Sequence, residues 1–155
     1  MEKFSVPEEL LHRFGLQGHV ENGAFAECNY PHEGPGRADS GAIYYYVSAN
    51  EYTKFHVIDC DEYWCYIAGS PLEIWQISPE GAITTVRLGI EEGCEPLVYL
   101  KKGVTFASRR FRQEQEGTFL SCITVPRFTY DGFTLVEDED AVKRWPETKA
   151  FFEAP

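Results

Sequence analysis

The sequence has few of the features that mark membrane or secreted proteins. It contains no stretch of about 18 consecutive apolar residues, and residues 1–11 contain no apolar run as long as that of a signal peptide. Its 5 cysteines form an odd set without a CxxC pair, a pattern typical of reduced thiols and not of a disulfide framework or a zinc ribbon. We therefore expect a cytoplasmic protein with no membrane partner.

Positive charge is also scarce. The chain has 14 Lys and Arg against 25 Asp and Glu, which gives a formal net charge of -11. Proteins bind nucleic acid largely through Lys and Arg side chains that release counterions from the phosphate backbone. The composition therefore argues against a DNA or RNA partner.

Apolar residues, by contrast, are plentiful. They make up 43% of the 155 residues, and 15% are aromatic, so one hydrophobic core can form. We expect a single domain over residues 1–155, with a core at about 15–137 and short terminal helices at 6–14 and 138–152. The first helix is predicted from a capping pattern over residues 5–8, and the second from an acidic first turn.

Between residues 23 and 135 the sequence consists of short apolar or alternating runs separated by Gly, Pro, Asn and Asp. This pattern predicts an all-β fold, a sandwich or jelly roll. Residues 31–40, with two prolines and two glycines, are predicted to be a surface flap. The ten predicted strands cover residues 24–29, 42–48, 54–58, 63–68, 72–78, 82–88, 97–100, 105–109, 118–125 and 133–136.

The segment 50–69 (NEYTKFHVIDCDEYWCYIAG) resembles the first sequence motif of the cupins. His56 stands at the first histidine of that motif, Glu62 at its glutamate and Gly69 at its closing glycine, whereas Ile58 replaces the second histidine. The second cupin motif resembles residues 101–106, where Phe106 replaces the last histidine.

A longer resemblance, over about residues 15–137, is to the cupin-5 family of RmlC-like cupins. Its members mostly lack an assigned reaction and are often described as candidate sugar epimerases. The resemblance implies a cupin jelly-roll barrel with a ligand in its interior. It is carried by Gly15-Leu16, His19, Gly23, Phe25-Ala26-Glu27, residues 40–44, Phe55-His56, residues 61–64, Ala68-Gly69, residues 71–73 and residues 121–125.

Metal-binding cupins hold their ion with three histidines and a glutamate, a donor set that suits divalent transition metals. Only His56 and Glu62 remain of that set here. We therefore expect no metal and no other cofactor.

The retained pair suits proton transfer. A carboxylate that contacts a histidine fixes its tautomer and raises its basicity, so we predict His56 as a general base with Glu62 as its partner, joined through a hairpin at residues 59–61, and Tyr44 as a candidate acid. The alternative is a hydrogen-bonded structural pair without function.

Other candidate ligand contacts follow from strand alternation and from the resemblance. Trp64 and Tyr66 share a strand face with Glu62, although aromatic residues on inner strand faces usually belong to the core. The full set of predicted ligand-binding residues is Trp64, Tyr66, Phe106, His19 and Glu27.

Two functions remain open from the sequence. The first is an isomerase or epimerase of a carbohydrate-like substrate, with His56 and Glu62 as the acid–base pair. The second is a non-catalytic cupin that binds or senses a ligand. A metal-dependent oxygenase or decarboxylase is disfavoured by the missing ligands. A homodimer is expected because sheet edges need covering.

Overall fold

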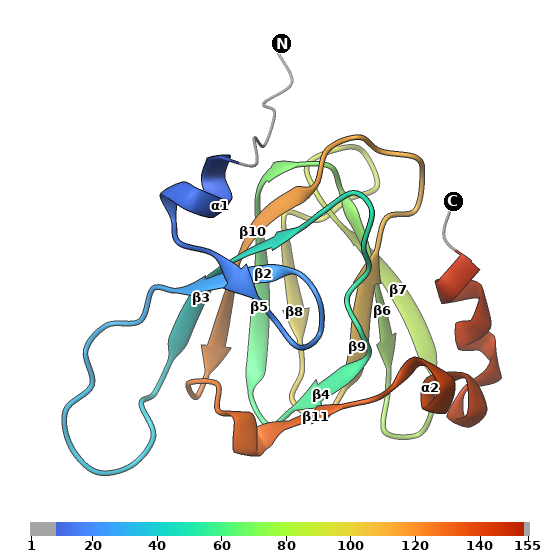
Figure 1. The fold of residues 1–155 in the computed structure, drawn as a ribbon. Coiled ribbons are helices and arrows are strands. Elements are labelled where there is room, and N and C mark those ends of the chain that lie inside the picture. Colours follow the sequence, from blue (N-terminus) through green and yellow to red (C-terminus); the bar gives the residue numbers. More distant parts are fainter. Residues whose placement is uncertain (1–8, 154–155) are drawn as a thin grey trace.

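The computed structural model describes residues 9–153 and consists of two antiparallel β-sheets that face each other (Figure 1). The six-stranded sheet has the order β1-β2-β3-β10-β5-β8, and the five-stranded sheet has the order β11-β4-β9-β6-β7. The predicted all-β jelly-roll architecture is thereby confirmed. In each sheet, strands that are distant in the sequence pair side by side.

The strands lie close to the predicted ranges, because β-branched and aromatic runs alternate with turn residues. The six-stranded sheet contains β1 (Gln17–Gly18), β2 (Ala24–Glu27), β3 (Gly41–Val47), β10 (Thr118–Val125), β5 (Asp61–Gly69) and β8 (Leu97–Leu100). The five-stranded sheet contains β11 (Phe133–Leu135), β4 (His56–Ile58), β9 (Thr105–Arg109), β6 (Leu72–Ile77) and β7 (Ile83–Leu88).

Short helices lie at both ends of the described chain. Helix α1 (Glu9–Arg13) precedes Phe14, whose ring packs on the outer side of the six-stranded sheet against Phe119; the predicted cap at residues 5–8 falls outside the described residues. Helix α2 (Asp138–Arg144) and the 3-10 helix η2 (Pro146–Glu153) bring Phe151 against the other sheet. None of the helices within residues 9–153 has the length and apolar character needed to cross a membrane.

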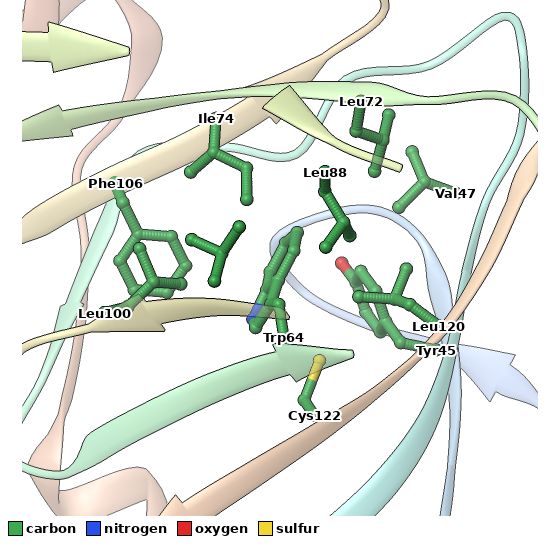
Figure 2. Packing of buried hydrophobic residues seen from close by; sticks show 11 residues of the cluster. Tyr45, Val47, Trp64, Leu72, Ile74, Leu88, Leu100, Phe106, Leu120 and Cys122 are labelled. Atoms are coloured by element: carbon green, nitrogen blue, oxygen red, sulfur yellow. The ribbon is translucent and has the colours of Figure 1, made fainter. Parts of the chain in front are cut away.

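The main hydrophobic core fills the space between the sheets. Figure 2 shows Trp64 at its centre, with Phe106 and Leu100 on one side of the indole and Tyr45 and Leu120 on the other. Trp64 is only 1% exposed, and burial of a large apolar side chain stabilises a fold by about 1.5–3 kcal/mol. Trp64 and Phe106 are therefore core residues, whereas the sequence suggested that they contact ligand.

The chain changes sheets between β4 and β5. Strand β4 pairs with β11 and β9, whereas β5 pairs with β10 and β8. The predicted hairpin across residues 59–61 is therefore wrong. His56 on β4 and Glu62 on β5 come from facing sheets, and both side chains are buried.

Candidate active site

One end of the space between the sheets contains a cavity of about 70 Å³ that the core does not fill. The segment that connects β10 to β11 contributes Arg127, Phe128 and the exposed Tyr130 to its lining. Its buried part holds His56, Glu62 and Glu21, and aromatic side chains surround its outer part. The lining comprises His19, Glu21, Phe25, Glu27, Asn29, Gly41, Ala42, Ile43, His56, Ile58, Glu62, Cys122, Thr124, Arg127, Phe128, Tyr130 and Phe133.

The backbone fixes the tautomer of His56. Its Nδ1 lies 2.8 Å from the carbonyl oxygen of Lys54 and 2.7 Å from Oε2 of Glu21. Because a carbonyl oxygen can only accept a hydrogen bond, Nδ1 carries the proton. In the neutral ring Nε2 therefore keeps its lone pair and is the nitrogen that can accept a proton from a bound molecule.

The surroundings of His56 also favour its protonated form. Burial lowers the pKa of His56, but the charge and close contact of Glu21, the Lys54 carbonyl and the charge of Glu62 together raise it above its ordinary value. The contact carboxylate is thus Glu21, where the sequence pointed to Glu62. Glu62 acts on His56 only through its charge.

Glu21 reaches the cavity from a tight turn between β1 and β2. Asn22 and Gly23 both adopt positive φ angles, of 77° and 75°, which asparagine and glycine tolerate best. The hydroxyl of the buried Tyr45 donates a hydrogen bond of 2.6 Å to the Asn22 carbonyl, and the backbone N–H of Lys54 donates one of 2.8 Å to the Glu21 carbonyl. The first bond holds the turn on β3, and the second holds it on the segment that leads into β4 and His56.

His19, in the same turn, has the opposite tautomer. Its Nδ1 accepts a hydrogen bond of 3.2 Å from the backbone N–H of Glu21, so the neutral ring carries its proton on Nε2. Burial lowers the pKa of His19, and the charge of His56 lowers it further, against an opposing effect of Glu21. The two neutral histidines therefore differ in role. His19 can donate a hydrogen bond from Nε2, whereas His56 can accept one at Nε2.

Glu62 is a buried carboxyl group that titrates near neutral pH. Burial raises its pKa, the charge of Glu21 raises it further, and His56 and the Trp64 indole lower it, which leaves a pKa of about 7. Trp64 has little effect on the pKa of Glu62, because the indole Nε1 makes no hydrogen bond of normal geometry. Glu62 can therefore give or take a proton at physiological pH.

Aromatic rings surround the outer part of the cavity. The ring of Phe128 lies 5.1 Å from that of Tyr130 and 5.8 Å from that of Phe133, measured between centroids. The His19 ring lies 5.0 Å from the ring of Phe25. Such walls suit the apolar face of a small ring or chain.

Of the eight residues predicted from the sequence, four line the cavity, namely His19, Glu27, His56 and Glu62. Trp64 and Phe106 belong to the adjoining core, where Phe106 contacts the His56 ring. The other two lie elsewhere: Tyr44 packs on the outer sheet face with Phe14 and Phe119, and the Tyr66 hydroxyl donates to the Gly69 carbonyl at the opposite end of β5. Tyr44 is therefore not placed to act as an acid at His56.

Sequence reasoning missed Glu21, Arg127 and the aromatic residues after β10. Only the Asn22-Gly23 pair gave a signal, because it marks a turn with positive φ directly after Glu21. The remaining side chains reach the cavity through contacts between distant segments, which leave no local pattern.

The donor set does not fit a metal ion. Ile58 and Phe106 occupy the positions at which metal cupins carry histidines, and Phe106 packs against the His56 ring with centroids 4.2 Å apart. Within residues 9–153 no three His, Cys, Asp or Glu side chains are grouped in a way that could hold a metal.

Comparison with solved structures agrees with this architecture. Protein SO0799 from Shewanella oneidensis is 29% identical with a TM-score of 0.85, over 99% of this chain and 96% of that one. A hypothetical protein from Leishmania major is 22% identical with a TM-score of 0.81, over 96% and 97% of the two chains. Both are similar to this chain over nearly their whole length.

A more distant similarity shows the fold alone. Oxalate decarboxylase from Bacillus subtilis is 14% identical with a TM-score of 0.60, and the match covers 100% of this chain but 37% of the decarboxylase. Comparison with curated proteins found no match. The family model Cupin_5, described as cupin superfamily (DUF985), matches residues 8–136, and the chain therefore belongs to this family.

Proposed function

We propose that the cavity binds a small carbohydrate-like molecule and that its histidines and Glu62 move protons to and from that molecule, the chemistry of an isomerase or epimerase. One observation carries the proposal. The Lys54 carbonyl and Glu21 occupy Nδ1 of the buried His56, which leaves Nε2 as the proton acceptor at the cavity. An oriented imidazole of raised basicity is the arrangement that general-base catalysis requires.

Two groups can return the proton. Glu62, with its pKa of about 7, is partly protonated at neutral pH. His19 presents an Nε2–H from the other side of Glu21. These donors replace Tyr44, which lies on the outer sheet face. A base and an acid at one cavity allow removal of a proton from one side of a carbon atom and its return from another.

Non-catalytic ligand binding is the second candidate. It is favoured by the apolar side chains of Ile58 and Phe106, which replace the metal ligands of catalytic cupins. In that case His56 and Glu62 would fix a ligand by hydrogen bonds and exchange no carbon-bound proton.

The test uses the molecule that co-purifies with the full chain, identified by mass spectrometry of the denatured protein. His56→Ala and Glu62→Gln are compared with Tyr44→Phe, a control outside the cavity. We expect both cavity variants to lose the ligand and the control to retain it. Retention of the ligand in both cavity variants would refute the site assignment.

Solvent exchange separates the two candidates. When the ligand is incubated with wild-type protein in D₂O, an isomerase introduces deuterium at carbon. We expect incorporation that His56→Ala abolishes, because Nε2 of His56 is the proposed acceptor. Bound ligand without any incorporation would favour the non-catalytic candidate.

A further inference from the structure

The charges at the cavity are unevenly distributed. Carboxylates occupy its buried part, at Glu21 and Glu62, and its outer part, at Glu27. If His56 is protonated, its charge is matched by Glu21, whose Oε2 lies 2.7 Å away. Neither histidine of the cavity forms an ion pair with Glu62 or Glu27. The remaining cationic side chain of the lining is that of Arg127.

Arg127 does not neutralise them, because its guanidinium is bound elsewhere. Nε donates to the Ser40 carbonyl and an Nη to the Tyr30 carbonyl, each at 2.9 Å. The guanidinium also lies 4.8 Å from the centre of the Tyr30 ring. These contacts fasten the loop between β2 and β3, and they direct the positive charge toward that loop.

The carboxyl group that can receive a ligand is that of Glu62. Glu62 lines the cavity and is only 8% exposed. It forms no ion pair with a side chain of residues 9–153, whereas Oε2 of Glu21 already lies 2.7 Å from Nδ1 of His56. A buried carboxylate without a contacting cation is costly, and a cationic donor on a bound molecule would remove that cost.

The cavity has room for a small polar group. Its volume of about 70 Å³ is several times the roughly 10–15 Å³ that one water molecule requires in a cavity. The rest of a ligand would lie between the outer rings of Phe25, Phe128, Tyr130 and Phe133. Aromatic rings attract cations that lie close to their faces.

We propose that the molecule bound in this cavity carries a protonated amine, whose N–H groups donate to the carboxylate of Glu62 while its apolar part lies among the outer rings. This inference rests on the proposed function and narrows its substrate class to small amine-bearing molecules. A protonated amine fits better than a quaternary ammonium group, because only the former can donate a hydrogen bond to the Glu62 carboxylate.

The test uses three probes of nearly the same shape. Cyclohexylmethylamine is cationic at pH 7, cyclohexylmethanol is neutral and cyclohexanecarboxylate is anionic. Their affinities for the full chain are measured by calorimetry, and binding at the cavity is verified by the shift of the His56 imidazole resonances. We expect the amine to bind about tenfold or more tighter than the alcohol, as a close charge pair provides.

Glu62→Gln tests the named carboxylate, and Glu139→Gln on α2, an exposed position, is the matched control for the change in net charge. The preference for amine over alcohol should disappear in Glu62→Gln and persist in Glu139→Gln. In wild-type protein near pH 6.5, amine binding should also release a proton as Glu62 ionises, which calorimetry in two buffers of different ionisation enthalpy detects.

Equal affinity for the amine and the alcohol, tightest binding of the carboxylate, or no binding of any probe would overturn the amine assignment. So would an amine preference that survives Glu62→Gln. Any of these outcomes would overturn only the amine assignment if the co-purifying molecule is still lost in His56→Ala, because the proposed function does not depend on an amine. If that molecule is retained in both cavity variants, the proposed function fails as well.

Discussion

Replacement of Glu62 by glutamine should stabilise the protein, and only at neutral and alkaline pH. The folded state holds this carboxyl in a buried position where its pKa rises from 4.5 to about 7. Because the folded state binds the proton more tightly than the unfolded state, stability falls as the pH rises from about 4.5 to about 7. Below this window the carboxyl is neutral in both states and glutamine offers no advantage.

The magnitude follows from that pKa difference. Each pKa unit corresponds to about 1.4 kcal/mol, so the ionised Glu62 costs roughly 3 kcal/mol at pH 8. Glutamine keeps the shape and has no charge to bury. We therefore expect Glu62→Gln to unfold at a temperature about 6–12 °C higher than wild type at pH 8, given about 2–4 °C per kcal/mol for a chain of this size, and at nearly the same temperature at pH 4.5.

Chemical denaturation at pH 4.5, 6, 7 and 8 measures this difference directly. The exposed Glu139→Gln variant provides the control, because it removes the same charge without relieving burial. If Glu62→Gln differs from wild type by the same amount at every pH, or is less stable at pH 8, the assignment of a raised Glu62 pKa is incorrect.

Four further predictions use other parts of the structure. Gly23→Ala should destabilise the fold by about 1–3 kcal/mol or more, because Gly23 has a φ of 75° and a Cβ there would lie 2.5 Å from the Tyr45 hydroxyl; denaturation that matches wild type would contradict this. Glu21→Gln should lower the pKa of both His56 and Glu62, since its charge raises each of them, and NMR titration showing either one rising would refute the coupling. Metal analysis of purified protein should find no stoichiometric transition metal, and a value near one per chain would overturn that expectation. Light scattering at micromolar concentration should give a dimer mass, because the sheets leave edge strands uncovered; a clean monomer would count against it.

The sequence predicted the jelly roll well, because strand propensity and turn residues act locally. The position of Tyr44 was harder to predict, since three consecutive tyrosines (residues 44–46) leave the phase of alternation undecided. A shift of one residue moves a side chain to the opposite face of a sheet. In the structure Tyr45 points into the core, and Tyr44 packs outside.

The composition of the site was predicted only in part. His56 and Glu62 were found because their spacing follows a known motif. Glu21 was missed because its contact with His56 depends on how the turn after β1 docks on residue 54, and no local pattern encodes that contact. Trp64 shares a face with Glu62, but it lies about 7 Å further along the strand. At that level core side chains fill the space between the sheets.

Three buried titratable groups, those of Glu21, His56 and Glu62, line the cavity. Their energetic cost favours a functional explanation of the cavity. A jelly roll of this size could fill the same space with apolar side chains and gain stability, because buried charged groups are often less stabilising than hydrophobic replacements. Here Glu62 lowers stability at neutral pH, and Glu21 places a second buried carboxylate nearby, in contact with His56. Tyr45 and the Asn22-Gly23 turn, in addition, hold Glu21 in place. A bound cation that pairs with Glu62 would offset the cost of this charge, so ligand affinity and the stability lost without ligand should depend on the same residue.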